Sequence, residues 1–130
     1  MAKRLSDKDI ELLNEPQIAC VATVGGDGAV QLTPVWVDTD GEAVVINTAK
    51  GRVKHKNLVA NPNISVLVVD RADLYRWLSV SGRAELVEEG ADEHIDRLAH
   101  KYLGVDSYPQ RTPGEVRVIV RVVPERRLGQ

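Results

Sequence analysis

The sequence predicts a mainly β protein that folds as a small antiparallel barrel, in a single domain over residues 1–130. Short apolar segments recur along the chain and are separated by turn residues, a pattern typical of strands in a small barrel. The first of these segments follow one another too closely for crossover helices, so a parallel sheet is excluded there. A chain of 130 residues can bury a core without the help of disulfide bonds.

The first element is a short helix that begins after Ser6. Serine is a favourable N-cap, and Asp9 stands three residues later, where the acid of a capping box is placed. The residue before a proline avoids the helical region, so we expect the helix to end at Glu15, before Pro16.

Three strands follow, over residues 18–24, 30–37 and 43–47. Glycine-rich or Asp-rich turns join them at residues 25–28 and 38–41, where positive backbone angles are needed. Consecutive strands joined by tight turns are typical of an antiparallel meander. We therefore expect these three strands to lie side by side in chain order.

The second half of the chain alternates helices and strands, which we expect over residues 52–60, 64–69, 76–87, 88–103 and 116–123. Gly82 inside the long strand indicates a bulge or bend. The last helix has acids in its first turn and Gly104 at its end, which are favourable helix termini. The pattern gives six strands and three short helices.

Composition narrows the class of protein. The net charge is −2, whereas nucleic-acid binders are usually strongly basic, so we expect no nucleic-acid partner. The N-terminus is polar and no apolar run is long enough to span a bilayer, which predicts a cytoplasmic protein with no membrane partner.

The single cysteine, Cys20, excludes an internal disulfide, and within its apolar strand we expect it to be buried. The three histidines lack metal-ligand spacing, so we expect no metal site.

The strongest signal for a ligand lies at residues 47–57, where four cations fall within seven residues at a strand-to-helix junction. Free backbone N–H groups and the positive end of the helix dipole meet at such a junction. Phosphate suits this arrangement, with a planar guanidinium from Arg52 and point charges from Lys50 and Lys54. A solvated basic helix face explains the same residues about as well.

A second signal is Pro34, which stands inside a predicted strand. A proline there belongs at a sheet edge or bulge, where backbone groups are free to bind the polar edge of a flat ring. Trp36 follows closely and could pack against one side of that ring. Taken alone, an edge strand with a packed tryptophan is the favoured reading. The chain has no evident nucleophile or base to accompany the predicted phosphate site at residues 47–57. This indicates that a cofactor supplies the chemistry. We therefore assign no catalytic residues.

Taken in order, these motifs resemble the pyridoxamine-phosphate-oxidase-like split-barrel superfamily of flavin and deazaflavin reductases. The resemblance covers nearly the whole chain and rests on residues 18–24, Thr33-Pro34-Val35-Trp36, Asn47-Thr48, Arg52-Val53-Lys54, Asn57-Leu58, Asn61-Pro62 and residues 64–67. It implies a six-stranded antiparallel split β-barrel of the FMN-binding type. It also implies a homodimer with the cofactor in a cleft between the subunits.

Within the superfamily, residues 76–84 and 118–129 are most similar to the branch that uses coenzyme F420, a deazaflavin. The resemblance implies a phosphate end, a ring-flanking set and a partner-subunit residue. The phosphate end would be formed by Lys50, Arg52, Val53 and Lys54 with Asn47 and Thr48. The ring system would be flanked by Gln31, Pro34, Val35 and Trp36. Trp77 would come from the partner subunit.

The implied function is an F420-dependent oxidoreductase that transfers a hydride from reduced deazaflavin to a small conjugated organic substrate. The alternatives are an FMN-binding reductase or oxidase of the same fold and a non-catalytic protein that binds a cofactor or tetrapyrrole. The flavin oxidases of the superfamily carry an Arg and a Lys on the second strand, whereas residues 31–37 here have neither. This departure disfavours pyridoxamine-phosphate oxidase activity and weakens the case for FMN.

Overall fold

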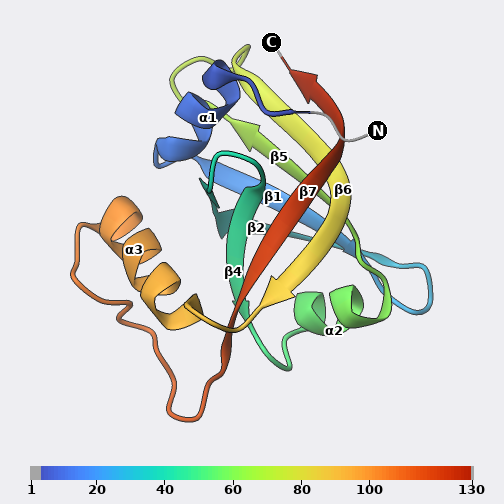
Figure 1. Cartoon of the computed structure of the whole chain (residues 1–130), viewed down its shortest axis with the longest axis vertical. Coiled ribbons are helices and arrows are strands. Elements are labelled where there is room, and N and C mark those ends of the chain that lie inside the picture. The colour runs from blue at the N-terminus through green and yellow to red at the C-terminus, as the bar shows by residue number, and fades with distance from the viewer. Residues whose placement is uncertain (1–3, 130) are drawn as a thin grey trace.

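One curled antiparallel sheet organises the chain in the computed structural model, which describes residues 4–129 (Figure 1). Its strands are β1 (Ile18–Val24), β2 (Val30–Trp36), β3 (Asp38–Thr39), β4 (Val44–Ala49), β5 (Asn63–Val69), β6 (Trp77–Val87) and β7 (Arg117–Gly129). Its helices are α1 (Asp7–Asn14), α2 (Val53–Ala60) and α3 (Ala91–Leu103). The first three residues, part of the basis for expecting no signal peptide, lie outside the described range.

The strand order is β2-β1-β5-β6-β7-β4-β3, so the predicted meander is only half right. The β1–β2 hairpin forms as expected, with Ile18 opposite Trp36. The expected third strand does not pair with β2 but with β7, where Asn47 lies opposite Ile119. Most positions of β4 are buried on both faces, and a central place beside the long β7 suits it better than an edge.

The seventh strand comes from the segment predicted as a turn. Asp38 and Thr39 pair with the start of β4, and the Thr39 hydroxyl donates a 2.7 Å hydrogen bond to the carbonyl of Ala43. Because β2 and β3 are the two ends of the sheet, the barrel does not close between them. The fold is therefore a split barrel, and its opening lies between β2 and the β3–β4 side.

The long strands β6 and β7 carry the predicted irregularity at Gly82. The register of the β6–β7 ladder shifts between Ser81 and Gly82. A side chain at Gly82 would place its Cβ 1.8 Å from the carbonyl oxygen of Val123, so only glycine fits. Strand β7 continues past the predicted end because Pro124 falls at this irregularity, where a missing N–H does not break the ladder.

The core lies on the concave face of the sheet. Leu12 and Leu13 of α1 enter it from one end and Leu58 of α2 from the other, as the positions of these helices in Figure 1 indicate. Helix α3 packs on the opposite face of β4 and β7. The Ser6–Asp9 capping box is present as predicted.

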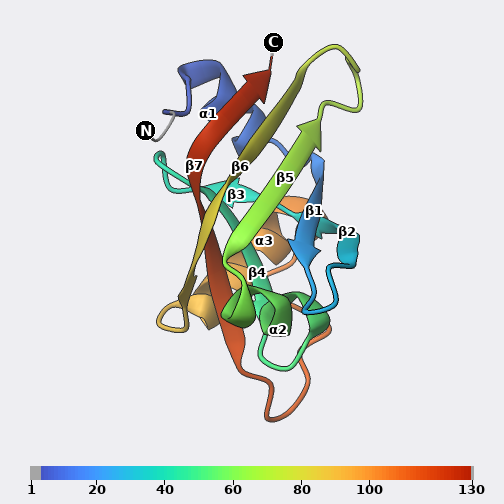
Figure 2. The ribbon, with the colours of Figure 1, turned by 90° about the vertical axis from the view of Figure 1, so that its right-hand side faces the viewer.

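Part of the convex face of the sheet carries no helix among residues 4–129. It is the convex side of β1, β2 and β5, which faces the viewer in Figure 2. Cys20 lies on this face and is exposed, so the expectation that it is buried is wrong. Both faces of β1 are apolar in sequence, which hides the alternation, and the buried positions are Ala19, Val21 and Thr23.

Candidate functional site

A cleft of about 350 Å³ lies at the opening of the split barrel. Its walls come from β1, β2, the end of β4, the start of α2, helix α3 and the segment leading into β7. Six of the residues named from the sequence line it: Pro34, Val35, Trp36, Asn47, Arg52 and Lys54. The two separate sequence signals, the basic junction and the proline-containing strand, thus meet at one place.

The cationic end of the cleft is built at the start of α2. Arg52 is the N-cap residue, its backbone is extended, and no side chain caps the first turn of the helix. Lys54 is half-buried; burial lowers the pKa of its ammonium group, and the nearby charge of Arg52 lowers it further. Crowded cations beside uncapped N–H groups favour an anionic ligand.

Arg117 adds a third cation, which the sequence analysis missed. Its guanidinium is buried and donates hydrogen bonds of 2.8 Å to Asn47 Oδ1 and 2.9 Å to Glu115 Oε1. Asn47 is held in turn by donating to the carbonyl of Ala91 and to Nδ1 of His94, each at 3.0 Å. Asn47 therefore orients Arg117 as well as lining the cleft.

The aromatic end of the cleft is centred on Trp36. Its ring stacks on Tyr102 with centroids 5.3 Å apart and meets Tyr108 edge-on at 6.0 Å. The Tyr102 hydroxyl donates to the carbonyl of Gln17 and accepts from the N–H of Val37 at 3.0 Å. Burial raises the pKa of Tyr102 to about 12, so this ring is a neutral support that fixes Trp36 at physiological pH.

The other residues named from the sequence lie outside the cleft lining. Lys50 forms a 2.8 Å ion pair with Glu88, and Val53 is 55% exposed. Thr48 is buried on the core face of β4, with no hydrogen-bond partner for its hydroxyl among the described residues.

Gln31 and Trp77 are also displaced from the cleft. Gln31 accepts a 3.4 Å hydrogen bond from Thr23 across the β1–β2 hairpin. Trp77 lies at the start of β6, in a separate hollow beside Leu12 of α1. Its alternation with buried Leu78 places Trp77 on the convex face of the sheet.

Six cleft residues were not found by sequence reasoning: Ile18, Ile95, Leu98, Tyr108, Gln110 and Arg117. An arginine at the start of an apolar strand is a weak signal for Arg117. Its relevance depends on the β4–β7 pairing, which sets it opposite Ala49 at the end of β4. Ile95 and Leu98 of α3 recur at helical spacing, which in sequence is typical of residues that pack in the core.

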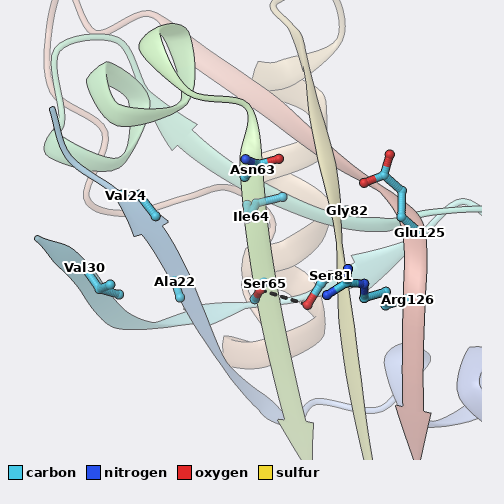
Figure 3. Close-up of a pocket in the computed structure, with 10 residues that line it drawn as sticks. All are labelled: Ala22, Val24, Val30, Asn63, Ile64, Ser65, Ser81, Gly82, Glu125 and Arg126. Carbon is cyan, nitrogen blue, oxygen red and sulfur yellow. Dashed lines mark hydrogen bonds between the residues drawn. The ribbon is translucent and has the colours of Figure 1, made fainter. Parts of the chain in front are cut away.

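A second hollow, of about 480 Å³, lies on the convex face (Figure 3). It spans β2, β1, β5, β6 and β7 at the Gly82 irregularity, and Ser65 and Ser81 form a 2.9 Å hydrogen bond within it. Arg126 is the one cation in its lining, beside Glu125. This hollow lacks the cation cluster of the cleft.

Residues 4–129 offer neither a metal centre nor a membrane-spanning helix. No group of three or more His, Cys, Asp or Glu side chains there is arranged to hold a metal ion. Among the helices of the same residues, none combines the length and the apolar character needed to cross a membrane.

The structure is thus a split barrel whose opening holds a cleft with cationic and aromatic residues in its lining. The sequence profile of the pyridoxamine 5'-phosphate oxidase family matches residues 5–129, so the chain belongs to that family. The earlier resemblance is thereby confirmed, although the sheet has seven strands where six were expected.

Solved structures agree with this assignment. The chain is similar to an F420 reductase, with 31% identity, a TM-score of 0.79 and coverage of 92% of this chain and 95% of that one. It is also similar to the conserved hypothetical protein Rv2991 from Mycobacterium tuberculosis (28% identity, TM-score 0.72, 95% and 82% coverage). HupZ from Group A Streptococcus follows (26% identity, TM-score 0.68, 96% and 98% coverage). No curated protein matches the sequence significantly.

Proposed function

We propose that this protein is an F420-dependent oxidoreductase that transfers a hydride from the reduced deazaflavin to a small conjugated organic substrate. The observation that carries the proposal is the cleft itself, which joins a cationic end at Arg52 and Lys54 to an aromatic wall at Trp36. The similarity to an F420 reductase at 31% identity supports the choice of cofactor.

The residues present fit a phosphate-bearing, flat cofactor. Burial lowers the pKa of Lys54 and the nearby charge of Arg52 lowers it further, and a bound phosphate would favour the charged ammonium group. Val35, Ile95 and Leu98 add apolar side chains to the lining of the cleft. Apolar walls with a few placed polar groups are typical of cofactor sites.

When bound, the deazaflavin supplies the hydride, and the protein has binding and orientation to perform. Arg52 and Lys54 would hold the phosphate. Ile95 and Leu98 would exclude water from one side of the ring. Trp36, fixed by Tyr102, would limit where the substrate can lie.

FMN is the second candidate cofactor. The match to the pyridoxamine 5'-phosphate oxidase family over residues 5–129 favours it. Strand β2, with sequence VQLTPVW, has no cation at its edge that could assist a flavin phosphate, which favours F420 instead.

We also propose that a second copy of the chain covers the convex face. Large apolar side chains are exposed there on neighbouring strands, with Val30 at 62%, Leu32 at 66% and Leu67 at 41%. Contiguous exposed apolar surface of this kind marks an interaction site. The alternation along β6 places Trp77 on the same face, and we propose that it contacts the partner subunit.

Spectral titration tests the cofactor assignment. Reduced and oxidised F420 and FMN are added separately to the purified protein, and absorbance and fluorescence are followed. We expect saturable binding of F420 at micromolar protein and weaker binding of FMN. Tight binding of FMN with no response to F420 would reverse the assignment, and binding without turnover of any reducible substrate would favour a carrier.

Sedimentation velocity tests the covering of the convex face. We expect the native chain to sediment as a dimer and Leu32→Glu, which places a charge in the exposed apolar surface, to sediment as a monomer. The matched control is Val59→Glu, because Val59 is 65% exposed and belongs to α2 rather than to the strands of that surface. A native monomer would contradict the proposal.

A further inference from the structure

A buried histidine stands behind the cationic end of the cleft. His94, near the start of α3, is 2% exposed, and its Nδ1 lies 3.0 Å from Nδ2 of Asn47. On the other side of the ring, Nε2 lies 3.5 Å from Oδ2 of Asp38 in β3. Asn47 lines the cleft, whereas His94 does not. The imidazole therefore lies between the edge of the sheet and the site.

The hydrogen bonds around Asn47 fix the direction of its amide. Nε of Arg117 can only donate, so the Asn47 atom that lies 2.8 Å from it is the amide oxygen. The carbonyl of Ala91 can only accept, so the Asn47 atom that lies 3.0 Å from it is the amide nitrogen. The same nitrogen donates to Nδ1 of His94, which is then the unprotonated nitrogen of the ring. His94 is thus a neutral imidazole with its proton on Nε2.

Asp38 favours this tautomer of His94. Burial opposes the ionisation of Asp38, but the contact with His94 and a hydrogen bond from the N–H of Thr39 outweigh it and lower the pKa of the carboxyl group. Among residues 4–129, Nε2 of His94 has no closer polar partner than Oδ2 of Asp38. An ionised carboxylate on this side attracts the ring proton to Nε2, which leaves Nδ1 free to accept from Asn47.

The same network holds the guanidinium of Arg117. Its Nε donates to Asn47 and its Nη1 to Glu115, and its side chain is 2% exposed. Within residues 4–129 these two bonds leave Nη2 without a protein acceptor, so it is available to a ligand in the cleft that Arg117 lines. A guanidinium held on two sides loses little side-chain freedom when it binds an anion.

Loss of the acceptor at Nδ1 of His94 would release the amide of Asn47. If the amide turned over, its nitrogen would face Nε of Arg117, and two donors cannot bond to each other. Arg117 would then lose one of the two contacts that hold it, and a buried donor without an acceptor is costly. The position of Arg117 therefore depends on a lone pair of His94 that lies outside the cleft.

We propose that His94 is a positioning residue for the phosphate end of the cleft, because its unprotonated Nδ1 fixes the amide of Asn47 and Asn47 in turn directs Arg117 toward the ligand. The inference deepens the proposed function and rests on it, since it takes a phosphate-bearing cofactor as the ligand. His94 acts through Asn47 and Arg117, and Asp38 supports it from the far side of the ring.

Three replacements of His94 separate the roles of its two ring nitrogens. His94→Asn keeps an acceptor near the position of Nδ1, His94→Gln keeps a donor near the position of Nε2, and His94→Leu keeps neither. Dissociation constants are measured for F420 and for the deazaflavin without its phosphate-bearing tail. For F420 we expect a rise of about tenfold in His94→Leu and His94→Gln, but of less than about threefold in His94→Asn. The affinity for the tail-free deazaflavin should not change across the series.

The matched control is His100→Leu. His100 is an exposed histidine of the same helix, so this variant removes an imidazole that is not bound to Asn47. It should leave both dissociation constants within about twofold of the native values. Urea unfolding of every variant measures the stability that is lost. An F420 affinity that follows stability, with no advantage of His94→Asn over His94→Gln, would overturn the inference, as would equal losses for the tail-free deazaflavin.

Nitrogen-15 NMR of the native protein keeps the inference testable if the His94 variants do not fold. Ring nitrogens with and without a proton differ in chemical shift, and we expect an unprotonated Nδ1 and a protonated Nε2 at neutral pH. A proton on Nδ1 of His94 would overturn the inference. If the native protein binds neither F420, FMN nor inorganic phosphate, the proposed function fails, whereas F420 binding that is equal in His94→Leu and His94→Asn refutes the role of His94 alone.

Discussion

Arg127, near the end of β7, forms a bidentate ion pair with Asp9 of helix α1. Its Nε donates to Oδ2, and its Nη2 donates to Oδ1 at 2.6 Å. Asp9 is 4% exposed and also accepts a 2.8 Å hydrogen bond from the N–H of Ser6. One carboxylate thus completes the cap of α1 and ties this helix to the last strand. This pair closes the end of the barrel opposite α2.

Asp9→Asn should destabilise the protein. The change leaves the partly buried Arg127 guanidinium without its charged partner, and a hydrogen bond to a charged group contributes about 1.5–3 kcal/mol. Urea unfolding monitored by circular dichroism measures the loss. Asp7→Asn, on an exposed residue of the same first turn, is the control and should change the unfolding free energy by less than about 0.5 kcal/mol.

Stability should fall in acid. Burial opposes ionisation of Asp9, but hydrogen bonds from Arg127 and Ser6 outweigh it and lower its pKa; bonds from Arg76 lower the pKa of Glu15 and Asp70. Because these folded-state pKa values lie below the unfolded ones, the unfolded chain binds more protons on acidification.

The stability that these carboxylates contribute is complete above their ordinary pKa values of 3.8 and 4.5 and is lost as pH falls through the lower folded values. Unfolding free energies measured between about pH 6 and pH 2 should decline steeply below about pH 4. Arg76→Met removes the partner of Glu15 and Asp70 and should make the decline of the unfolding free energy shallower. A profile that stays flat to pH 2 would contradict this account.

Gly82→Ala should distort the β6–β7 ladder. The added Cβ would lie 1.8 Å from the Val123 carbonyl oxygen, a contact that only backbone movement can relieve. Overpacking typically costs about 1–3 kcal/mol, which is measurable as a lower midpoint in urea. Gly26→Ala is the control, since nothing lies within 4 Å of its Cβ position. Equal stability of the two variants would refute the close approach.

Lys54→Ala should weaken binding of the phosphate-bearing cofactor by about 1.5–3 kcal/mol, the usual worth of a hydrogen bond to a charged group. This corresponds to a rise in the dissociation constant of roughly 10- to 150-fold. Lys50→Ala serves as the control, because Lys50 pairs with Glu88 outside the cleft lining. An unchanged affinity in Lys54→Ala would remove Lys54 from the phosphate site.

Cofactor affinity should decline at alkaline pH. The free protein holds the pKa of Lys54 below its ordinary value of 10.5, and a bound anion would raise it. Binding therefore favours the protonated amine and is lost as pH rises through the pKa of the free protein. Fluorescence titrations at stepped pH measure this loss, and Lys54→Met, which has no ionisable amine, should show a smaller one.

The positions of most elements were predictable from the sequence because their signals are local. The capping box at Ser6 and Asp9, the bulge at Gly82 and the edge position of Pro34 each depend on residues close in the chain. Turn chemistry and hydrophobic periodicity act over the same short range. The basic junction that forms one end of the cleft was found in this way.

The pairing of β4 with β7 was decided only in the tertiary structure. Several strands here are equally rich in valine and isoleucine, so nothing local distinguishes one partner from another. That pairing brings Arg117 to Asn47 and sets Glu115 beside Arg52. The sequence by itself therefore determined most of the elements and the cations at residues 50–54. The strand β3, the third cation, its counter-charge and the cleft that joins them to Trp36 depend on contacts between residues far apart in the chain.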